Sequence, residues 1–475
     1  MSDKKPIERW CTRLLMLGCA LFILYGITIL LLRACLPVQL GIFEGKTLCQ
    51  VVQAADGSAI YRDPTVHGAA DIYTPLYPLV MSAVYRTADP SFLWGRLFSL
   101  GLALLAGGFL LRTFLRRPGG GTVALLFAAM FISIAWQTEW FFAAFKSDLL
   151  CHVLWLAAYG LLLRRSMAST CGAAALLMLA FFAKQTAVFA LPGAVLFLFI
   201  DRRRHLLPFV VVAGAAFALY FFLFRQLAGD WMAFYIFGRM KIQANHGYSV
   251  SELMHYAFLF RRSPVTLMGV GLALYFARDL WRDRPYRLAL LAAPFFIGGS
   301  VLTAASEGGD TNSLIPAYFA LTCLAAMGFE RAIASAGDLR ASAVAVALVL
   351  LPFQFDSWAP YNVSKARGRF DASFVDVVDY LKNQDGSMYA PSHNVITLFA
   401  GHPAFDDRGL ARYIEPLNAG AVNRIHTRVN DGRYDWLVMD THEKDGLLMS
   451  DDTRAAYELV ATFDVWQVFR KAGDE

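Results

Sequence analysis

Charged side chains are scarce in this sequence. Asp, Glu, Lys and Arg make up 17% of its 475 residues, whereas an average soluble domain contains about 25%. Hydrophobic residues reach 57% and the mean hydropathy is +0.46, so the chain has more apolar surface than one soluble core of this size buries. The composition therefore argues against a soluble protein and indicates an integral membrane protein.

Cysteine motifs for metal or redox chemistry are also missing. The seven cysteines contain no CxxC pair and no metal-ligand spacing, and most of them lie in or beside apolar runs as small apolar residues. Cys35 and Cys49 are expected in the first external loop, and a disulfide between them is left open. The net charge of +6 does not indicate a nucleic-acid partner, because much of the Lys and Arg lies in short loops between apolar runs.

Long apolar runs dominate what is present. A window of about 19 residues finds about eleven candidate membrane spans, several of them shorter than the roughly 20 residues that a perpendicular helix needs. The first run is too long for a signal peptide and lacks its cleavage site, so we expect it to remain as an anchor. The runs lie at 12–32, 92–114, 122–142, 149–163, 168–183, 186–200, 206–224, 264–278, 286–304, 312–329 and 341–355.

Basic residues predict the topology. Arginines recur in alternate loops, at 116–117, 164–165, 202–204, 278–287 and 331–340. Such loops are usually cytoplasmic, so we expect a cytoplasmic N-terminus. With an odd number of spans, the C-terminal segment is expected on the extracytoplasmic side, most simply in the periplasm beside a bacterial inner membrane.

Composition changes abruptly after about residue 360. The stretch 372–401 indicates an amphipathic helix, a glycine turn and a short strand, and 433–440 and 459–470 are two further strand-like runs. We therefore expect a transmembrane domain at 1–360 and a small soluble α/β domain at 364–475.

The first external loop, at about 33–91, has helical patterns too short to span a membrane, which is typical of helices lying in the interface. Ionisable residues gather at the same membrane face, where they are costly unless they face a polar cavity. They therefore predict a site. Besides Glu44 and Lys46 in the loop, they are Lys146, Asp148, Lys184, Arg239, Lys241, His246, Glu307 and Asp310.

Several short motifs occur in a recognisable order: FEGK at 43–46, YRDP at 61–64, YTPLYPLV at 73–80, WGRLFSL at 94–100, KSD at 146–148 and AKQT at 183–186. Over roughly residues 1–330 this order resembles polytopic glycosyltransferases of the GT-C architecture that use lipid-linked sugars. The bacterial branch related to protein O-mannosyltransferases (GT39-like) and the lipid A aminoarabinose transferase are the most similar groups. The resemblance implies an inverting hexosyl- or pentosyltransferase that moves a sugar from a polyprenyl phosphate to an acceptor hydroxyl on the extracytoplasmic face.

The resemblance also implies roles for individual residues. Glu44 matches the acid that serves as catalytic base, Asp148 matches a second acidic position, and Lys184 matches a lysine near the donor phosphate. Many relatives have Asp, often beside a second acid, where this chain has the single Glu44, and this leaves dependence on a divalent metal open. Further phosphate contacts are expected from Arg239, Lys241 and His246, and substrate contacts from Arg62, Asp63, Tyr73 and Arg96.

Simpler interpretations remain beside these. Glu44 is then a solvated helix-terminal charge, Asp148 an N-cap and Lys184 a snorkelling side chain. A transporter or flippase for a lipid-linked sugar would have a similar span count, although it would need charges or broken helices near mid-membrane. A sensory protein with the C-terminal domain as receptor is a third alternative. The sequence leaves open the sugar, the acceptor (a lipid, a glycan or a protein), the oligomeric state and the role of the C-terminal domain.

Overall fold

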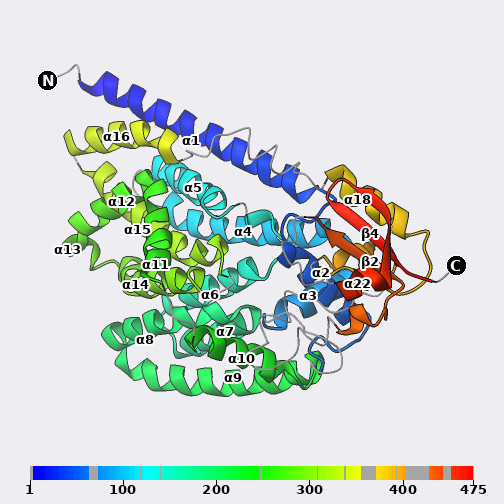
Figure 1. The fold of residues 1–475 in the computed structure, drawn as a ribbon. Coiled ribbons are helices and arrows are strands. Elements are labelled where there is room, and N and C mark those ends of the chain that lie inside the picture. Colours follow the sequence, from blue (N-terminus) through cyan, green and yellow to red (C-terminus); the bar gives the residue numbers. More distant parts are fainter. Residues whose placement is uncertain are drawn as a thin grey trace.

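The computed structural model describes residues 4–63, 73–117, 120–139, 141–245, 249–306, 309–335, 338–354, 371–391, 393–402, 427–441 and 451–473. Helices packed side by side form most of this part of the chain, and a small β-sheet lies at one end of them (Figure 1). The fold class expected from the sequence, a polytopic helical membrane protein with a small C-terminal α/β unit, is confirmed.

Each predicted span coincides with a helix or with two consecutive helices. Within the described ranges, six helices are long and apolar enough to cross a membrane: α1 (Lys4–Ala34), α4 (Phe92–Leu115), α5 (Gly120–Gln137), α9 (Leu206–Ala228), α14 (Arg284–Ala304) and α15 (Ile315–Ala334). Shorter apolar helices are α6 (Asp148–Leu162), α7 (Met167–Ala183), η2 (Gln185–Phe189) with α8 (Ala190–Asp201), α12 (Pro264–Tyr275) with α13 (Ala277–Leu280), and α16 (Asp338–Gln354). The total of eleven spans stays a prediction.

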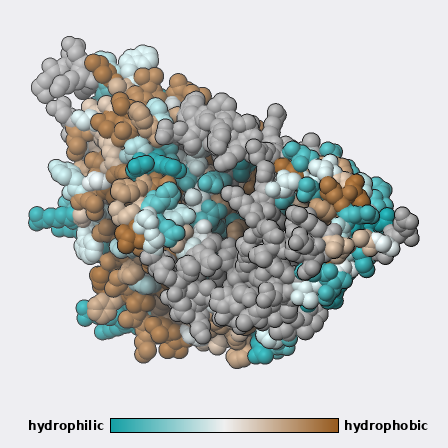
Figure 2. All heavy atoms as spheres, in the orientation of Figure 1, coloured by the Kyte–Doolittle hydropathy of each residue, from teal (hydrophilic) through white to brown (hydrophobic). Residues whose placement is uncertain are grey.

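The helices differ in how much of their apolar surface the protein itself covers. In α15, 94% of the most apolar window is buried, whereas the values are 28% for α1 and 6% for α9. α15 is therefore central, and α1 and α9 present apolar faces outward, as lipid-facing helices do. Apolar residues concentrate on the helical part of the molecule, and polar residues are more frequent around the sheet (Figure 2).

The arginine-rich loops meet at the end of the bundle away from the sheet. Arg117 donates to Asp283 at 2.7 Å and to Glu330 at 2.8 Å, and Arg284 donates to Asp201 at 2.8 Å. Both arginines come from stretches that the sequence grouped by charge, whereas Asp201 ends α8 and Glu330 lies on α15. The other end of the bundle carries α2 (Ile42–Ala55) and α3 (Leu76–Tyr85), the short helices of the first loop (Figure 1).

One membrane helix is sharply bent. α11 (Val250–Leu259) and η4 (Phe260–Arg262) meet α12 at 89°. Gln354 fixes this bend: its Oε1 accepts the backbone N–H groups of Val265 at 3.0 Å and Thr266 at 3.4 Å, and its Nε2 donates to the Ser133 hydroxyl at 2.8 Å. The free amides at the start of α12 are thereby satisfied, and α12 and α16 are joined to α5.

The C-terminal unit is a four-stranded sheet of order β1-β2-β4-β3, in which β1 and β2 are parallel and the other pairs antiparallel. Its elements are α18 (Asp371–Leu381), β1 (Met388–Tyr389), α19 (Val395–Phe399), β2 (Trp436–Asp440), α22 (Asp451–Ala456), β3 (Tyr457–Phe463) and β4 (Trp466–Lys471). The predicted run 459–470 is a hairpin rather than one strand, because Asp464 turns the chain with a φ of 50°. The predicted boundary at 360–364 lies outside the described residues.

The C-terminal unit packs directly against α2 of the first loop and against the start of α4. The ring of Phe399 on α19 meets the ring of Phe92 edge-on at 5.4 Å between centroids. A Cβ added to Gly45 on α2 would lie 3.0 Å from Val395. The sheet domain thus supports the helix that carries Glu44.

Candidate functional site

Buried charges gather where several elements end on the side of the bundle near the sheet. α4 and α6 begin there, α7 ends there, and η5 (Thr311–Leu314) leads into α15. α2 begins after Gly41, whose φ of −169° is extended, and Glu44 in its first turn faces the positive end of the helix dipole. Residues 138–139 and 141–147 lie between α5 and α6, beside these elements.

Glu44 forms a closed ion pair with Arg96 on α4. Glu44 Oε1 accepts Arg96 Nε at 3.0 Å and the Phe145 amide at 2.8 Å. Glu44 Oε2 accepts Arg96 Nη2 at 2.6 Å and the Leu40 amide at 2.9 Å. Exposure is 2% for Glu44 and 0% for Arg96. With two bonds on each oxygen, the carboxylate has no lone pair left for another donor.

The same contacts determine the protonation of Glu44. Burial raises the pKa of a carboxyl, but here the charge and hydrogen bonds of Arg96, joined by the Phe145 and Leu40 amides, outweigh burial and hold the pKa of Glu44 below its usual range. The remaining guanidinium donors of Arg96 bond the carbonyls of Leu36 at 2.6 Å and Val38 at 2.7 Å. The pair therefore fastens the end of α1, α2, α4 and residue 145 together.

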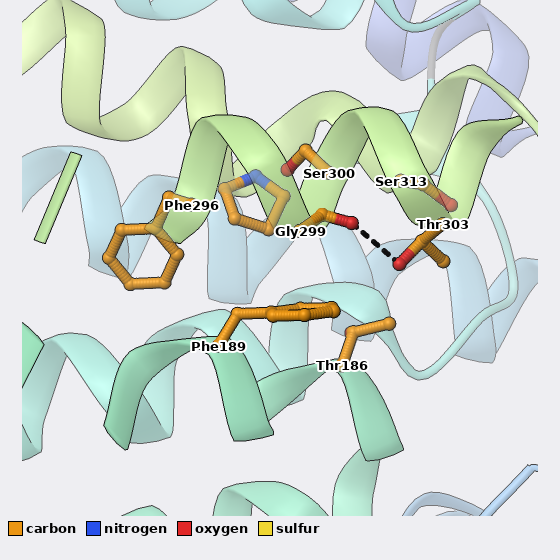
Figure 3. Close-up of a pocket in the computed structure, with 8 residues that line it drawn as sticks. Thr186, Phe189, Phe296, Gly299, Ser300, Thr303 and Ser313 are labelled. Carbon is orange, nitrogen blue, oxygen red and sulfur yellow. Dashed lines mark hydrogen bonds between the residues drawn. The ribbon is translucent and has the colours of Figure 1, made fainter. Parts of the chain in front are cut away.

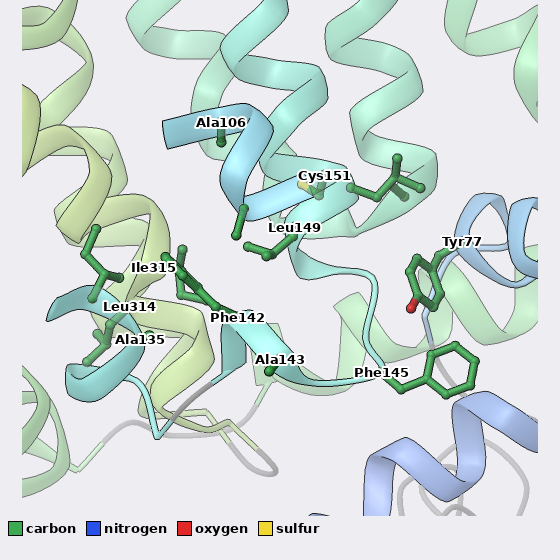
Figure 4. Packing of buried hydrophobic residues seen from close by; sticks show 14 of the residues in the cluster. Tyr77, Ala106, Ala135, Phe142, Ala143, Phe145, Leu149, Cys151, Leu314 and Ile315 are labelled. Carbon is green, nitrogen blue, oxygen red and sulfur yellow. The ribbon is translucent and has the colours of Figure 1, made fainter. Parts of the chain in front are cut away.

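Gly95 allows this fastening. A Cβ at Gly95 would overlap the ring of Phe145, so the ring lies directly on the backbone of α4. Tyr77 and Tyr85 of α3 flank the same ring, with centroids 5.8 and 6.0 Å away. Figure 4 shows Phe145 at the end of the segment after α5, with Tyr77 beside it. This packing directs the Phe145 amide to Glu44.

Asp148 is the centre of a second buried cluster. Its Oδ1 accepts Lys184 Nζ at 2.5 Å and Asn312 Nδ2 at 3.0 Å, and the three residues are 3%, 4% and 3% exposed in the order Asp148, Lys184, Asn312. Both bonds use one oxygen, and within the described part of the chain Oδ2 accepts no hydrogen bond. Lys184 lies at the break between α7 and η2, with its ammonium 5.3 Å from the centre of the Tyr73 ring.

Lys146 is a functional candidate to which the sequence assigned no role. Its ammonium lies 4.2 Å from the ring centre of Phe141 and 4.7 Å from that of Phe43, and the residue is 5% exposed. Burial lowers the pKa of Lys146, and the charge of Asp148 only partly offsets this. The available signal was its place in the KSD motif, among the ionisable residues that predicted a site.

A small pocket lies beside the Asp148 cluster. Its lining continues from the residues that hold Asp148, since Thr186 follows Lys184 by two positions and Ser313 follows Asn312. Phe189 lies on one side and Ser300 and Thr303 of α14 on the other (Figure 3). The complete lining is Thr186, Phe189, Phe296, Gly299, Ser300, Thr303, Ser313 and Pro316.

The other predicted residues are placed as follows. Arg62 is half-buried and donates from Nε to the Ala59 carbonyl at 3.1 Å, and Asp63 is also half-buried. Arg239 and Lys241 lie on α10 (Met232–Asn245), but their side chains, with all of His246 and Glu307, lie outside the described part. The structure therefore brings together Glu44 with Arg96, and Asp148 with Lys184 and Tyr73.

The structure also bears on whether a metal site and a disulfide are present. Across the described ranges, no three His, Cys, Asp or Glu side chains are grouped as metal ligands. Glu44 and Asp148 are each bonded to a cationic side chain instead. Cys35 is exposed and Cys49 buried, and no disulfide joins the two.

Comparisons with known proteins bear on the fold. No family model matches the sequence, and no curated protein matches it. The chain is similar to the crystal structure of ArnT from Cupriavidus metallidurans bound to undecaprenyl phosphate, with a TM-score of 0.64 and 15% identity over 96% of this chain and 98% of that one. For ArnT in the apo state the TM-score is 0.60 and the identity 16%, over 95% and 97%. The GT-C-type fold implied by the sequence motifs is confirmed.

Proposed function

We propose that this chain is an integral-membrane glycosyltransferase that moves a sugar from a polyprenyl-phosphate donor to an acceptor hydroxyl of a lipid, glycan or protein. One observation carries the proposal: a buried acid, Asp148, is held by Lys184 and Asn312 at one end of the membrane helices. The fold shared with ArnT supports it. We place the arginine-rich end in the cytoplasm and the site and sheet domain outside, as the loop charges predict.

The chemistry requires a base and a cation. The acceptor hydroxyl attacks the anomeric carbon and loses its proton to a carboxylate while the lipid phosphate leaves. A single displacement inverts the anomeric centre. Negative charge grows on the leaving phosphate, so fixed cations directed at it lower the barrier. The site contains both kinds of group within one segment, at Lys146 and Asp148.

We assign the base to Asp148. Its Oδ2 accepts no hydrogen bond from the described residues, while Oδ1 is oriented by Lys184 and Asn312. The sequence-based assignment of Glu44 as base stays a prediction, but both of its oxygens already accept two bonds each. We therefore propose that Glu44 and Arg96 position the loop, and that Tyr73, Arg62 and Asp63 lie toward the substrate. Lys184, Arg239, Lys241 and His246 are retained as candidates near the donor phosphate.

A transporter of lipid-linked sugars is disfavoured by where the charges lie. The buried acid–base pairs are at the ends of helices, whereas alternating access uses a site near mid-membrane. Among the described residues only one apolar helix pair is sharply bent, so matched broken helices in two halves are not seen there.

A transfer assay in detergent tests the function. Membranes of a strain that lacks this gene should hold both unused donor and unmodified acceptor. Purified protein mixed with a detergent extract of those membranes should consume the polyprenyl-phosphate sugar and release polyprenyl phosphate. Detergent micelles have no compartments, so a transporter would leave the donor intact, and that result would remove the proposal.

A further inference from the structure

We propose that Lys146 is the residue that binds the phosphate of the lipid donor; this inference rests on the proposed function and specifies its anion site. Among the described residues, the site contains four buried cations on neighbouring elements, namely Arg96, Lys184, Lys46 and Lys146. Arg96 is paired with Glu44 at 2.6 Å, and Lys184 is paired with Asp148 at 2.5 Å. Lys146 forms no ion pair within 4 Å among the described residues, although it is 5% exposed.

The neighbours of Lys146 hold it without neutralising it. The rings of Phe141 and Phe43 attract an ammonium through their negative faces, but they carry no net charge. Lys46 approaches the same Phe43 ring, at 5.3 Å, and adds a second positive charge. A buried cation without a counter-ion is costly, and an anionic ligand in this place would remove that cost.

The three acids near Lys146 already have hydrogen-bond or ion-pair partners of their own. The negative charges of Asp148, Asp310 and Glu44 act on it from a distance. Asp310 accepts the Thr311 amide at 2.6 Å, Glu44 is paired with Arg96, and Asp148 is paired with Lys184 through Oδ1. Since Lys146 precedes Asp148 by two residues, a phosphate on its ammonium would lie close to the carboxylate that we assign as base. The bond that breaks is the one between that phosphate and the sugar.

Binding of undecaprenyl phosphate and of undecaprenol to the full-length protein separates the phosphate from the lipid tail. Dissociation constants are measured for wild type, Lys146→Met, Lys146→Arg and a matched control, Lys382→Met, in which the changed side chain is 52% exposed on the sheet domain. Wild type and the control should prefer the phosphate form. Lys146→Met should lose roughly 10-fold to 100-fold of that preference, the range for a charged hydrogen bond, and Lys146→Arg should keep most of it.

Each other result has a distinct meaning. Equal preference in wild type and Lys146→Met would overturn this inference and leave the proposed function standing, whereas no preference in wild type would overturn both. Displacement of the lipid by inorganic phosphate would show a site for free phosphate instead. The thermal midpoint of ligand-free Lys146→Met should equal or exceed that of wild type; a marked loss would show that the lysine serves only to stabilise the loop.

Discussion

The two buried acids of the site differ in how many hydrogen bonds their carboxylate oxygens already accept. Glu44 accepts four hydrogen bonds, two of them from one guanidinium, whereas Asp148 accepts both of its bonds on Oδ1. A carboxylate with every lone pair engaged stabilises structure, and one with an open oxygen can take a proton. The sequence ranks them the other way, because Glu44 matches the position of the catalytic base in the enzymes that the motifs resemble.

Glu44→Gln should destabilise the protein. The amide nitrogen would face N–H donors at one of the two oxygen positions, and Arg96 would lose its counter-ion while remaining 0% exposed. Breaking a buried ion pair typically costs about 3–5 kcal/mol, so unfolding in detergent should occur at clearly lower temperature or denaturant concentration.

Glu8→Gln is the matched control. Glu8 pairs with Arg340 at 2.8 Å, but the side chains are 27% and 45% exposed, and exposed pairs contribute only about 0–1 kcal/mol. If Glu44→Gln were as stable as Glu8→Gln, Glu44 would not have the positioning role assigned to it.

Among the elements, the segment between α5 and α6 packs against α4 at Gly95, which has no side chain. Gly95 leaves room for the Phe145 ring against α4, and the next residue, Arg96, completes the Glu44 pair. Aromatic packing and the ion pair thus begin at adjacent positions of one helix. The segment they hold carries Lys146 and leads into Asp148.

Gly95→Ala should therefore damage the site. The added methyl overlaps Phe145, and overpacking of this kind costs about 1–3 kcal/mol. Gly101→Ala, in the same helix, is the control, because a Cβ there meets nothing within 4 Å and alanine favours a helix by up to about 1 kcal/mol over glycine. We expect lower stability and slower transfer for the first variant and neither for the second; equal behaviour would contradict the packing argument.

The helices were predictable because their signal is local. Apolar runs located every helix expected as a span, and the strand-like run at 433–440 located β2. The hairpin turn at Asp464 was missed, since a polar residue inside an apolar run does not by itself show a reversal of the chain. The Gln354 contacts at the bend before α12 join residues 88 to 221 positions apart, which no local pattern reveals.

The site was predictable only in part, because its contacts join residues that are far apart in the sequence. The motifs singled out Glu44, Asp148 and Lys184, and Arg96 was named among substrate contacts. Arg96 pairs with Glu44, 52 positions earlier, and Lys184 pairs with Asp148, 36 positions earlier. Both pairs form only through tertiary packing. Pairing decides which charge remains open, so the sequence could propose the set of charges but could not distribute the roles.

At the scale of the whole molecule, charges divide between the two ends of the bundle. Arginines and the acids they pair with connect the loops at one end. The Glu44–Arg96 pair and the Asp148–Lys184 pair lie at the other end, near the sheet domain. α19 packs on α2 directly behind Glu44, with Phe399 against Phe92. The sheet domain is thus placed to support the site.

The rate of sugar transfer per folded molecule tests the account most directly. Wild type, Asp148→Asn and Glu44→Gln are purified, their folded fractions measured, and each is supplied with the donor and acceptor extract of the deletion strain. Asp148→Asn keeps the oxygen that bonds Lys184 but cannot take a proton, so its rate should fall by about 10²–10⁴-fold. Folded Glu44→Gln should stay within roughly 10-fold of wild type, since a general base accounts for more than that. Wild-type turnover by Asp148→Asn, with folded Glu44→Gln slowed by the larger factor, would contradict the account and return the base to Glu44.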